Sequence, residues 1–85
     1  MAKLVKVYST QYCPYCTRAK SLLKSRNIDF QEIDLSDDPD TRERLQSETG
    51  WMTVPMIFIG SEFVGGSDDL QRLAQTGELD RKLKD

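Results

Sequence analysis

The feature that most constrains this chain is an apolar run at residues 54–59, Val-Pro-Met-Ile-Phe-Ile. The run lacks the alternation of apolar and polar residues that a strand with one exposed face shows. It is typical of a strand that is buried on both faces. A sheet built around such a strand needs cover on both sides, so we expect helices above and below it. The 85 residues suffice for one small domain, which we place at residues 1–85.

Segments on either side of this run predict the other elements of an α/β fold. The predicted strands span residues 3–9, 29–34, 54–59 and 62–64. The predicted helices span residues 14–26, 39–49, a segment that Ser67 caps and Gly77 ends, and a final turn at 78–84. The first strand, helix and second strand form a βαβ unit with parallel strands. The last two strands form a hairpin. The result is a four-stranded mixed sheet with helices on both faces.

Composition excludes several functional classes. The net charge of −2 and the pI of about 5.1 argue against a nucleic-acid partner, which needs a basic surface. No apolar run approaches the roughly 20 residues of a membrane span, so no membrane partner is expected. Residues 1–6 are not followed by the apolar stretch of a signal peptide. The chain contains no histidine, which excludes histidine bases, Ser-His-Asp triads and histidine-bound metals.

The two cysteines, Cys13 and Cys16, are the candidate reactive groups. Two thiols without a histidine do not complete a four-ligand zinc site within one chain. A structural disulfide across so short a loop would stabilise the fold little. Without a sign of secretion, we expect the chain in the reducing cytoplasm, where such a pair is catalytic or metal-binding rather than part of the core.

The position of Cys13 before a predicted helix favours its thiolate, because unpaired N–H groups and the helix dipole stabilise negative charge there. Arg18 and Lys20 lie within the next two turns and add positive charge. Because a thiolate is the species that attacks disulfides, we expect Cys13 to be the nucleophile. Cys16 lies one turn further on, nearer the core. We expect it to stay protonated until it attacks a mixed disulfide formed at Cys13.

Three motifs resemble those of the dithiol glutaredoxins. They are Cys-Pro-Tyr-Cys at 13–16, Thr-Val-Pro at 53–55 and Gly-Gly-Ser-Asp-Asp-Leu at 65–70. The resemblance covers the whole chain and implies the thioredoxin-like fold of that family. It also implies an enzyme that reduces protein disulfides and glutathione mixed disulfides through the Cys13/Cys16 couple. Glutathione would be the co-substrate, with no tightly bound cofactor and no metal.

The resemblance also implies which residues bind glutathione. They are Tyr15, Thr53, Val54, Pro55, Gly66, Ser67 and Asp68. The backbone of Val54, beside a cis Pro55, would pair with the cysteinyl backbone of glutathione. The N–H groups of Ser67 and Asp68 would bind the γ-glutamyl carboxylate, and the Asp68 side chain would receive the ammonium group. Tyr12 and Trp51 are expected to pack against the protein rather than to contact a ligand.

Two positions depart from the family pattern. Thr10 stands where many members have a lysine for the glycyl carboxylate of glutathione, and Met52 stands where a basic or amide residue is common. These departures leave open a disulfide reductase driven by thioredoxin reductase. A dimer that binds an iron–sulfur cluster through Cys13 and glutathione is a further alternative, which Pro14 disfavours. The expected partners are glutathione and disulfide-containing or glutathionylated proteins, and the chain is expected to be a monomer.

Overall fold

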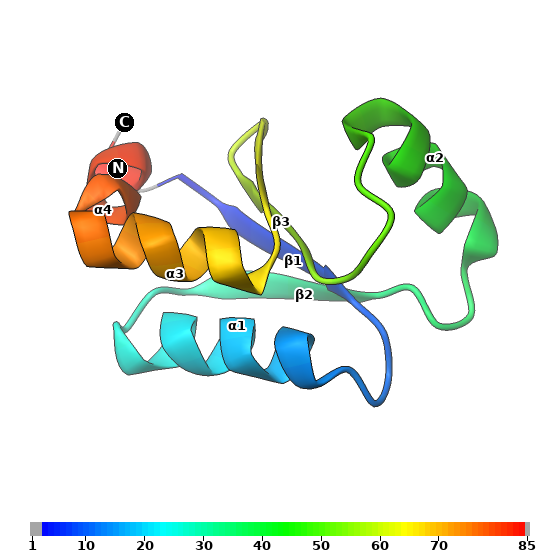
Figure 1. Ribbon diagram of the computed structural model, residues 1–85, viewed down its shortest axis with the longest axis horizontal. Coiled ribbons are helices and arrows are strands. Elements are labelled where there is room, and N and C mark those ends of the chain that lie inside the picture. Colours follow the sequence, from blue (N-terminus) through cyan, green and yellow to red (C-terminus); the bar gives the residue numbers. More distant parts are fainter. Residues whose placement is uncertain (1–2, 85) are drawn as a thin grey trace.

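The computed structural model describes residues 3–84 of the chain. Its strands are β1 (Val5–Ser9), β2 (Phe30–Asp34), β3 (Met56–Ile59) and β4 (Glu62–Gly65). Its helices are α1 (Pro14–Ser25), α2 (Pro39–Thr49), α3 (Ser67–Thr76) and α4 (Glu78–Lys84). Helices α1 and α3 pack against each other on one face of the sheet, and Figure 1 shows α2 at the opposite end of the molecule from α4. None of the helices within these residues is long and apolar enough to cross a membrane.

The strands form one mixed sheet in the order β2-β1-β3-β4. Strand β1 pairs with β2 in parallel, with Val5 opposite Phe30. It pairs with β3 in the antiparallel sense, with Val5 opposite Ile59. Strands β3 and β4 form an antiparallel hairpin, whose register shifts between Ile57 and Phe58. The structure therefore confirms the predicted βαβ unit and the predicted hairpin.

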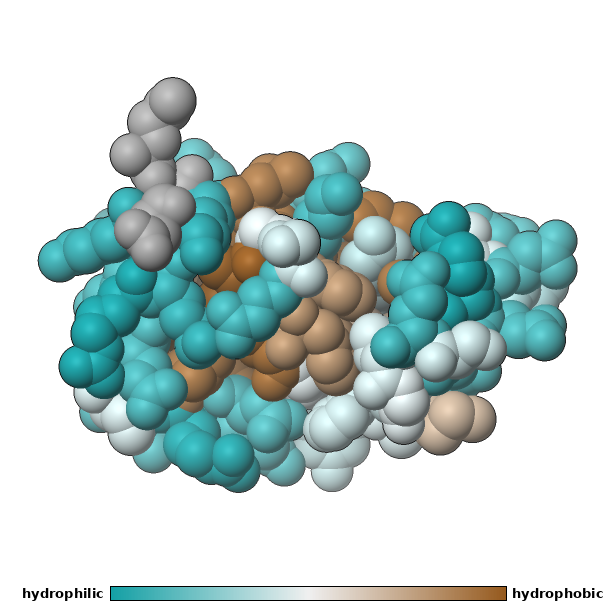
Figure 2. Space-filling view, turned by 90° about the horizontal axis from the view of Figure 1, so that it is seen from above, coloured by the Kyte–Doolittle hydropathy of each residue, from teal (hydrophilic) through white to brown (hydrophobic). Residues whose placement is uncertain are grey.

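Helices cover both faces of the sheet, as the buried run at residues 54–59 predicts. On one face, Ile57 and Ile59 pack with side chains of α1, α3 and α4. On the other face, Met56 packs with Leu35 and with Leu45 of α2. Figure 2 looks down on the side of the molecule away from α1 and shows apolar side chains between two hydrophilic ends.

Several predicted boundaries were wrong by one or two residues. Strand β3 begins at Met56 rather than Val54, because its pairing with β1 begins with Met56 opposite Tyr8. Strand β1 begins at Val5 rather than Lys3, whose N–H donates to the carbonyl of Leu83 at 2.9 Å. Strand β2 likewise begins one residue later than predicted, at Phe30, and α1 ends one residue earlier, at Ser25.

The start of α3 also differs from the prediction. Gly66, not Ser67, is the N-cap, and Ser67 is the first helical residue. The carboxylate of Asp69 accepts the N–H of Gly66 at 3.1 Å, so the cap comes from within the helix. Strand β4 continues through Gly65, where φ is +114°, a conformation that favours glycine. The chain passes from strand to helix within a single residue, which places the helix N-terminus close to the sheet.

Candidate active site

Cys13 is the N-cap of α1, as its position before Pro14 predicts. The backbone N–H of Cys16 donates to Cys13 Sγ at 3.3 Å. The Cys13 side chain is partly exposed, and both cysteines are free thiols in this structure. A donor aimed at Sγ, together with the helix dipole, stabilises a thiolate at this position.

Cys16 has the opposite environment, since only 1% of its surface is exposed. Burial raises the pKa of the Cys16 thiol to about 12, and a hydrogen bond to Cys13 adds to this shift. The backbone N–H of Thr10 and the charge of Lys20 act in the other direction. Cys16 is therefore a shielded, protonated thiol at neutral pH, as predicted.

The segment before β3 lies against the cysteine pair. The thiol of Cys13 donates to the carbonyl of Val54, with Sγ 3.7 Å from that oxygen. The bond between Val54 and Pro55 is cis, which confirms the expectation from the family resemblance. Val54 therefore contacts the sulfur of Cys13 and also lines a surface groove.

That groove has a volume of about 450 Å³. Every residue predicted to bind glutathione lines it: Tyr15, Thr53, Val54, Pro55, Gly66, Ser67 and Asp68. Tyr15 comes from α1, and the guanidinium of Arg18 lies 5.5 Å from the centre of its ring. Cation–π contact with Arg18 helps to hold the ring in place as one wall of the groove.

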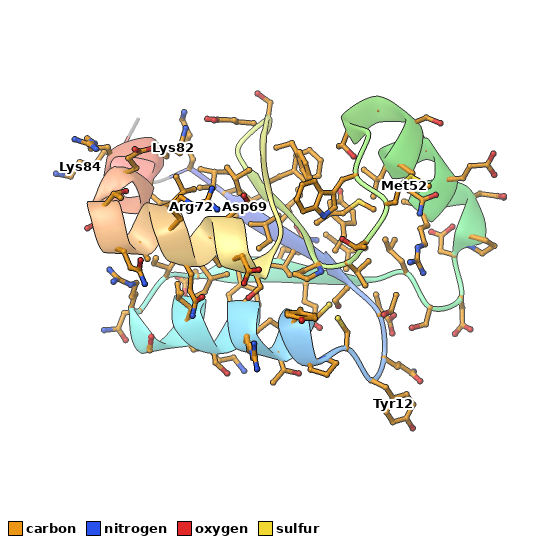
Figure 3. All side chains as sticks on the ribbon, viewed as in Figure 1. Tyr12, Met52, Asp69, Arg72, Lys82 and Lys84 are labelled. Atoms are coloured by element: carbon orange, nitrogen blue, oxygen red, sulfur yellow. The ribbon has the colours of Figure 1, made fainter. Side chains whose placement is uncertain are left out.

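The N-terminus of α3 forms the opposite wall. Asp68 and Asp69 have different roles there. The Asp69 carboxylate caps the helix through Gly66 and lies 3.4 Å from Arg72, and Figure 3 shows the two labelled side chains close together. Asp68 is exposed, and its carboxylate forms no ion pair with a described side chain. It is the carboxylate of this pair that remains available to a ligand.

Four residues of the groove lie outside the predicted binding set: Arg42, Trp51, Met52 and Asp69. Arg42 belongs to the charged helix α2, in which nothing in the sequence distinguishes it from Arg44. Trp51 packs edge-on against Phe63, with ring centres 5.7 Å apart, as expected. Its buried indole N–H has no partner among residues 3–84. The packing prediction for Trp51 was correct, but its place beside the groove depends on the tertiary fold.

Three further residues named in the sequence analysis have environments that the structure now defines: Tyr12, Thr10 and Met52. The prediction that Tyr12 packs was wrong: its side chain is 99% exposed, and Figure 3 shows it pointing outward from the loop before α1. Tyr12 has a φ of +58°, which turns the chain sharply there. Thr10 lines a separate cavity beside the cysteines rather than the groove, whereas Met52 lines the groove. Neither residue carries a charge that would bind a carboxylate.

Metal chemistry has no protein-borne site in the described part of the chain. Among residues 3–84, no group of three His, Cys, Asp or Glu side chains is arranged to hold a metal ion.

Comparisons with known proteins agree with this geometry. A family model described as glutaredoxin matches residues 5–64. The chain is 48% identical over 79 residues to a glutaredoxin of Pseudomonas aeruginosa, covering 93% of this chain and 94% of the relative. It is 44% identical over 80 residues to glutaredoxin 3 of Escherichia coli K12, covering 94% and 96% of the two chains.

Solved structures give the same result. The solution structure of a glutaredoxin from Brucella melitensis superposes with a TM-score of 0.87 at 47% identity, covering 98% of this chain and 90% of the other. The crystal structure of a buckwheat glutaredoxin–glutathione complex has a TM-score of 0.87 at 35% identity, covering 93% of this chain and 74% of the other. These matches confirm the thioredoxin-like fold that the motifs implied.

Proposed function

This chain belongs to the glutaredoxin family of thiol–disulfide oxidoreductases, and we propose that it uses glutathione to reduce protein disulfides and glutathione mixed disulfides. The observation that carries the proposal is the position of Val54. Its carbonyl lies 3.7 Å from Cys13 Sγ, and the same residue lines the groove. A glutathione molecule in the groove would therefore have its sulfur next to the nucleophile. One structural relative was solved as a complex with glutathione.

The groove offers partners for the γ-glutamyl end of glutathione. The first N–H groups of a helix have no partner within the helix and attract a carboxylate. At the start of α3, these groups belong to Ser67 and Asp68. The free carboxylate of Asp68 then pairs with the α-ammonium group. The backbone of Val54 pairs with the cysteinyl residue in the manner of an added strand.

Arg42 supplies what Thr10 and Met52 lack. It is the cationic residue that α2 contributes to the groove, whose lining also includes Met52 and Thr53. With the γ-glutamyl end at α3, the glycyl carboxylate extends toward this side. We therefore assign the glycyl carboxylate to Arg42, through a charge-assisted hydrogen bond.

The chemistry proceeds by thiol–disulfide exchange. The Cys13 thiolate attacks one sulfur of the substrate disulfide and releases the other as a thiolate. Cys16 then attacks Cys13 Sγ, which releases the reduced substrate and leaves a disulfide between the two cysteines. One glutathione thiolate opens this disulfide at Cys13, and a second releases oxidised glutathione and restores the dithiol.

The decisive experiment compares two electron donors. Reduction of a small disulfide is followed through NADPH oxidation, with glutathione plus glutathione reductase in one assay and thioredoxin reductase in the other. We expect turnover with glutathione and little or none with thioredoxin reductase. The reverse result would support the alternative reductase, which the neutral residues Thr10 and Met52 favour.

A pair of cysteine variants tests the division of labour between the thiols. Cys16→Ser should retain reduction of glutathione mixed disulfides, because that route needs only Cys13, and should lose most direct reduction of protein disulfides. Cys13→Ser should lose both activities. Loss of both activities in a folded Cys16→Ser protein would contradict the mechanism, as would turnover by Cys13→Ser. The monomeric state and the cytoplasmic location stay predictions.

A further inference from the structure

A second cavity, of about 430 Å³, lies on the other side of the cysteine pair. Both Cys13 and Cys16 line it, together with polar and charged side chains of β1, β2 and α1. The Lys20 ammonium lies 2.7 Å from a carboxylate oxygen of Glu32, and the hydroxyl of Ser9 donates to the same oxygen at 2.9 Å. Three elements thus converge on one ion pair beside the buried thiol.

The attack of Cys16 on the mixed disulfide at Cys13, called here the resolving step, takes place at the wall of this cavity. Cys16 must lose its proton before it attacks Cys13, yet the residue is buried and burial disfavours the thiolate. Two further contributions that disfavour the thiolate come from Cys13 itself. A mixed disulfide at Cys13 carries no charge, so the repulsion between two thiolates is then absent. In the reduced protein, the N–H of Thr10 and the charge of Lys20 favour the Cys16 thiolate against burial.

Lys20 is the one cation among the residues that line this cavity, all of which belong to the described part of the chain. It follows Cys16 by four positions on α1, so the two side chains lie on the same helix face. The other charged groups facing the cavity are the carboxylates of Glu32 and Asp34. Asp34 accepts the N–H of Ser36 at 2.8 Å, whereas Glu32 binds Lys20 directly. The Lys20 side chain is 26% exposed, so solvent screens its charge only in part.

On the premise of the proposed function, we propose that Lys20, held in place by Glu32 and Ser9, is a positioning residue that stabilises the Cys16 thiolate in the resolving step. The Cys16 proton passes to solvent water at the cavity. The thiolate attacks Cys13 Sγ, the bond from Cys13 to the substrate sulfur breaks, and that sulfur leaves with the electron pair. The dithiol is oxidised by two electrons, and the substrate thiol is reduced. Lys20 keeps its proton throughout.

The experiment isolates this step from glutathione and its reductase. The reduced protein reacts with Ellman's reagent, which forms a mixed disulfide at Cys13, and the attack of Cys16 then releases a second thionitrobenzoate. The rate of this second release is measured by stopped flow between about pH 6 and pH 10, where thiolates form. For Lys20→Met we expect the rise of the rate with pH to move toward higher pH, with release at neutral pH slowed roughly threefold to tenfold.

Matched variants separate this role from other effects. Lys20→Arg keeps the charge and should restore the profile of the unmodified protein. Lys24→Met removes the same charge from an exposed position one turn further along α1 and should leave the profile unchanged. A profile of Lys20→Met that coincides with that of the unmodified protein, or an equal shift in Lys24→Met, would overturn the proposal. Absence of the second release in the unmodified protein would instead refute the dithiol mechanism, and the glutathione assay tests the electron donor separately.

Discussion

Cys13 and Cys16 lie one helical turn apart and differ in exposure and in hydrogen bonding. The Cys13 side chain is partly exposed and accepts an N–H at 3.3 Å, whereas Cys16 is 1% exposed and burial raises its pKa to about 12. Backbone geometry causes the difference. The N-cap position points one sulfur toward the free N–H groups of the helix, and the helix face that packs on the sheet carries the other sulfur into the core.

Selective alkylation should follow from this difference. Brief treatment of the reduced protein with iodoacetamide at neutral pH should modify Cys13 at least about tenfold faster than Cys16, because alkylation requires an accessible thiolate. Peptide mass spectrometry measures the two sites separately. Cys13→Ser is the control, in which the remaining thiol should stay largely unmodified. Comparable labelling of Cys16 would contradict its burial.

Arg42 is the groove residue to which the proposed function assigns the glycyl carboxylate of glutathione. Arg42→Gln should raise the KM for glutathione roughly threefold to tenfold, because it removes one charge-assisted contact with the glycyl carboxylate. The kcat at saturating glutathione should change little. Arg44→Gln is the matched control, since Arg44 pairs with Glu48 at 3.8 Å and is absent from the lining of the groove. Equal effects of the two substitutions would refute the assignment.

At the scale of the element, the start of α3 depends on the close approach of β4 to the helix. A Cβ atom on Gly65 would lie 2.5 Å from Oδ2 of Asp69, the carboxylate that caps the helix. Real Cβ atoms do not approach so closely, so a side chain at Gly65 would displace the cap. The same carboxylate holds the N–H of Gly66, and the position of the α3 N-terminus in the groove depends on that contact.

Two glycine variants separate the cost of backbone conformation from the cost of this contact. Gly77→Ala, at a φ of +83° with open space around it, should lower the free energy of unfolding by about 1 kcal/mol. Gly65→Ala should lower it by about 1–3 kcal/mol more, since it meets both penalties. Urea denaturation followed by circular dichroism measures both values. Equal losses would show that the contact with Asp69 contributes nothing.

At the scale of the whole molecule, stability depends on a small core. The larger cluster joins both central strands to α1, α3 and α4. A chain of 85 residues buries a modest share of its surface, so each fully buried side chain represents a large part of the total stability. The short helix α4 belongs to this core through Leu79, which is 0% exposed.

Leu79→Ala should therefore remove about 2–5 kcal/mol from the free energy of unfolding, the usual cost of a large cavity. In a domain of this size, that loss approaches the full stability. Thermal unfolding followed by circular dichroism tests the expectation. Leu83→Ala is the comparison on the same helix, because Leu83 is only partly buried and should cost less. A Tm unchanged by Leu79→Ala would show that α4 is not part of the cooperative core.

Much of the fold and the reactive pair could be predicted from local sequence. Helix α2 begins at Pro39 and ends at Thr49, as predicted, because Asp38 caps it and Gly50 takes the left-handed conformation at its end. The Cys-Pro-Tyr-Cys segment likewise predicted Cys13 at a helix N-terminus, because Pro14 suits the first turn of a helix. Caps, prolines and glycines act on neighbouring residues and are therefore readable along the chain.

The tertiary structure alone decided which distant side chains meet. Arg42 and Trp51 line the groove, and Glu32 reaches Lys20, only because α2 and β2 pack where they do. The N-cap of α3 is Gly66 rather than Ser67, because the carboxylate of Asp69 accepts the N–H of Gly66. Such contacts depend on the register of the sheet and on helix packing, which no local pattern specifies. Sequence alone determined the elements and the chemistry of the thiols, and packing decided what surrounds them.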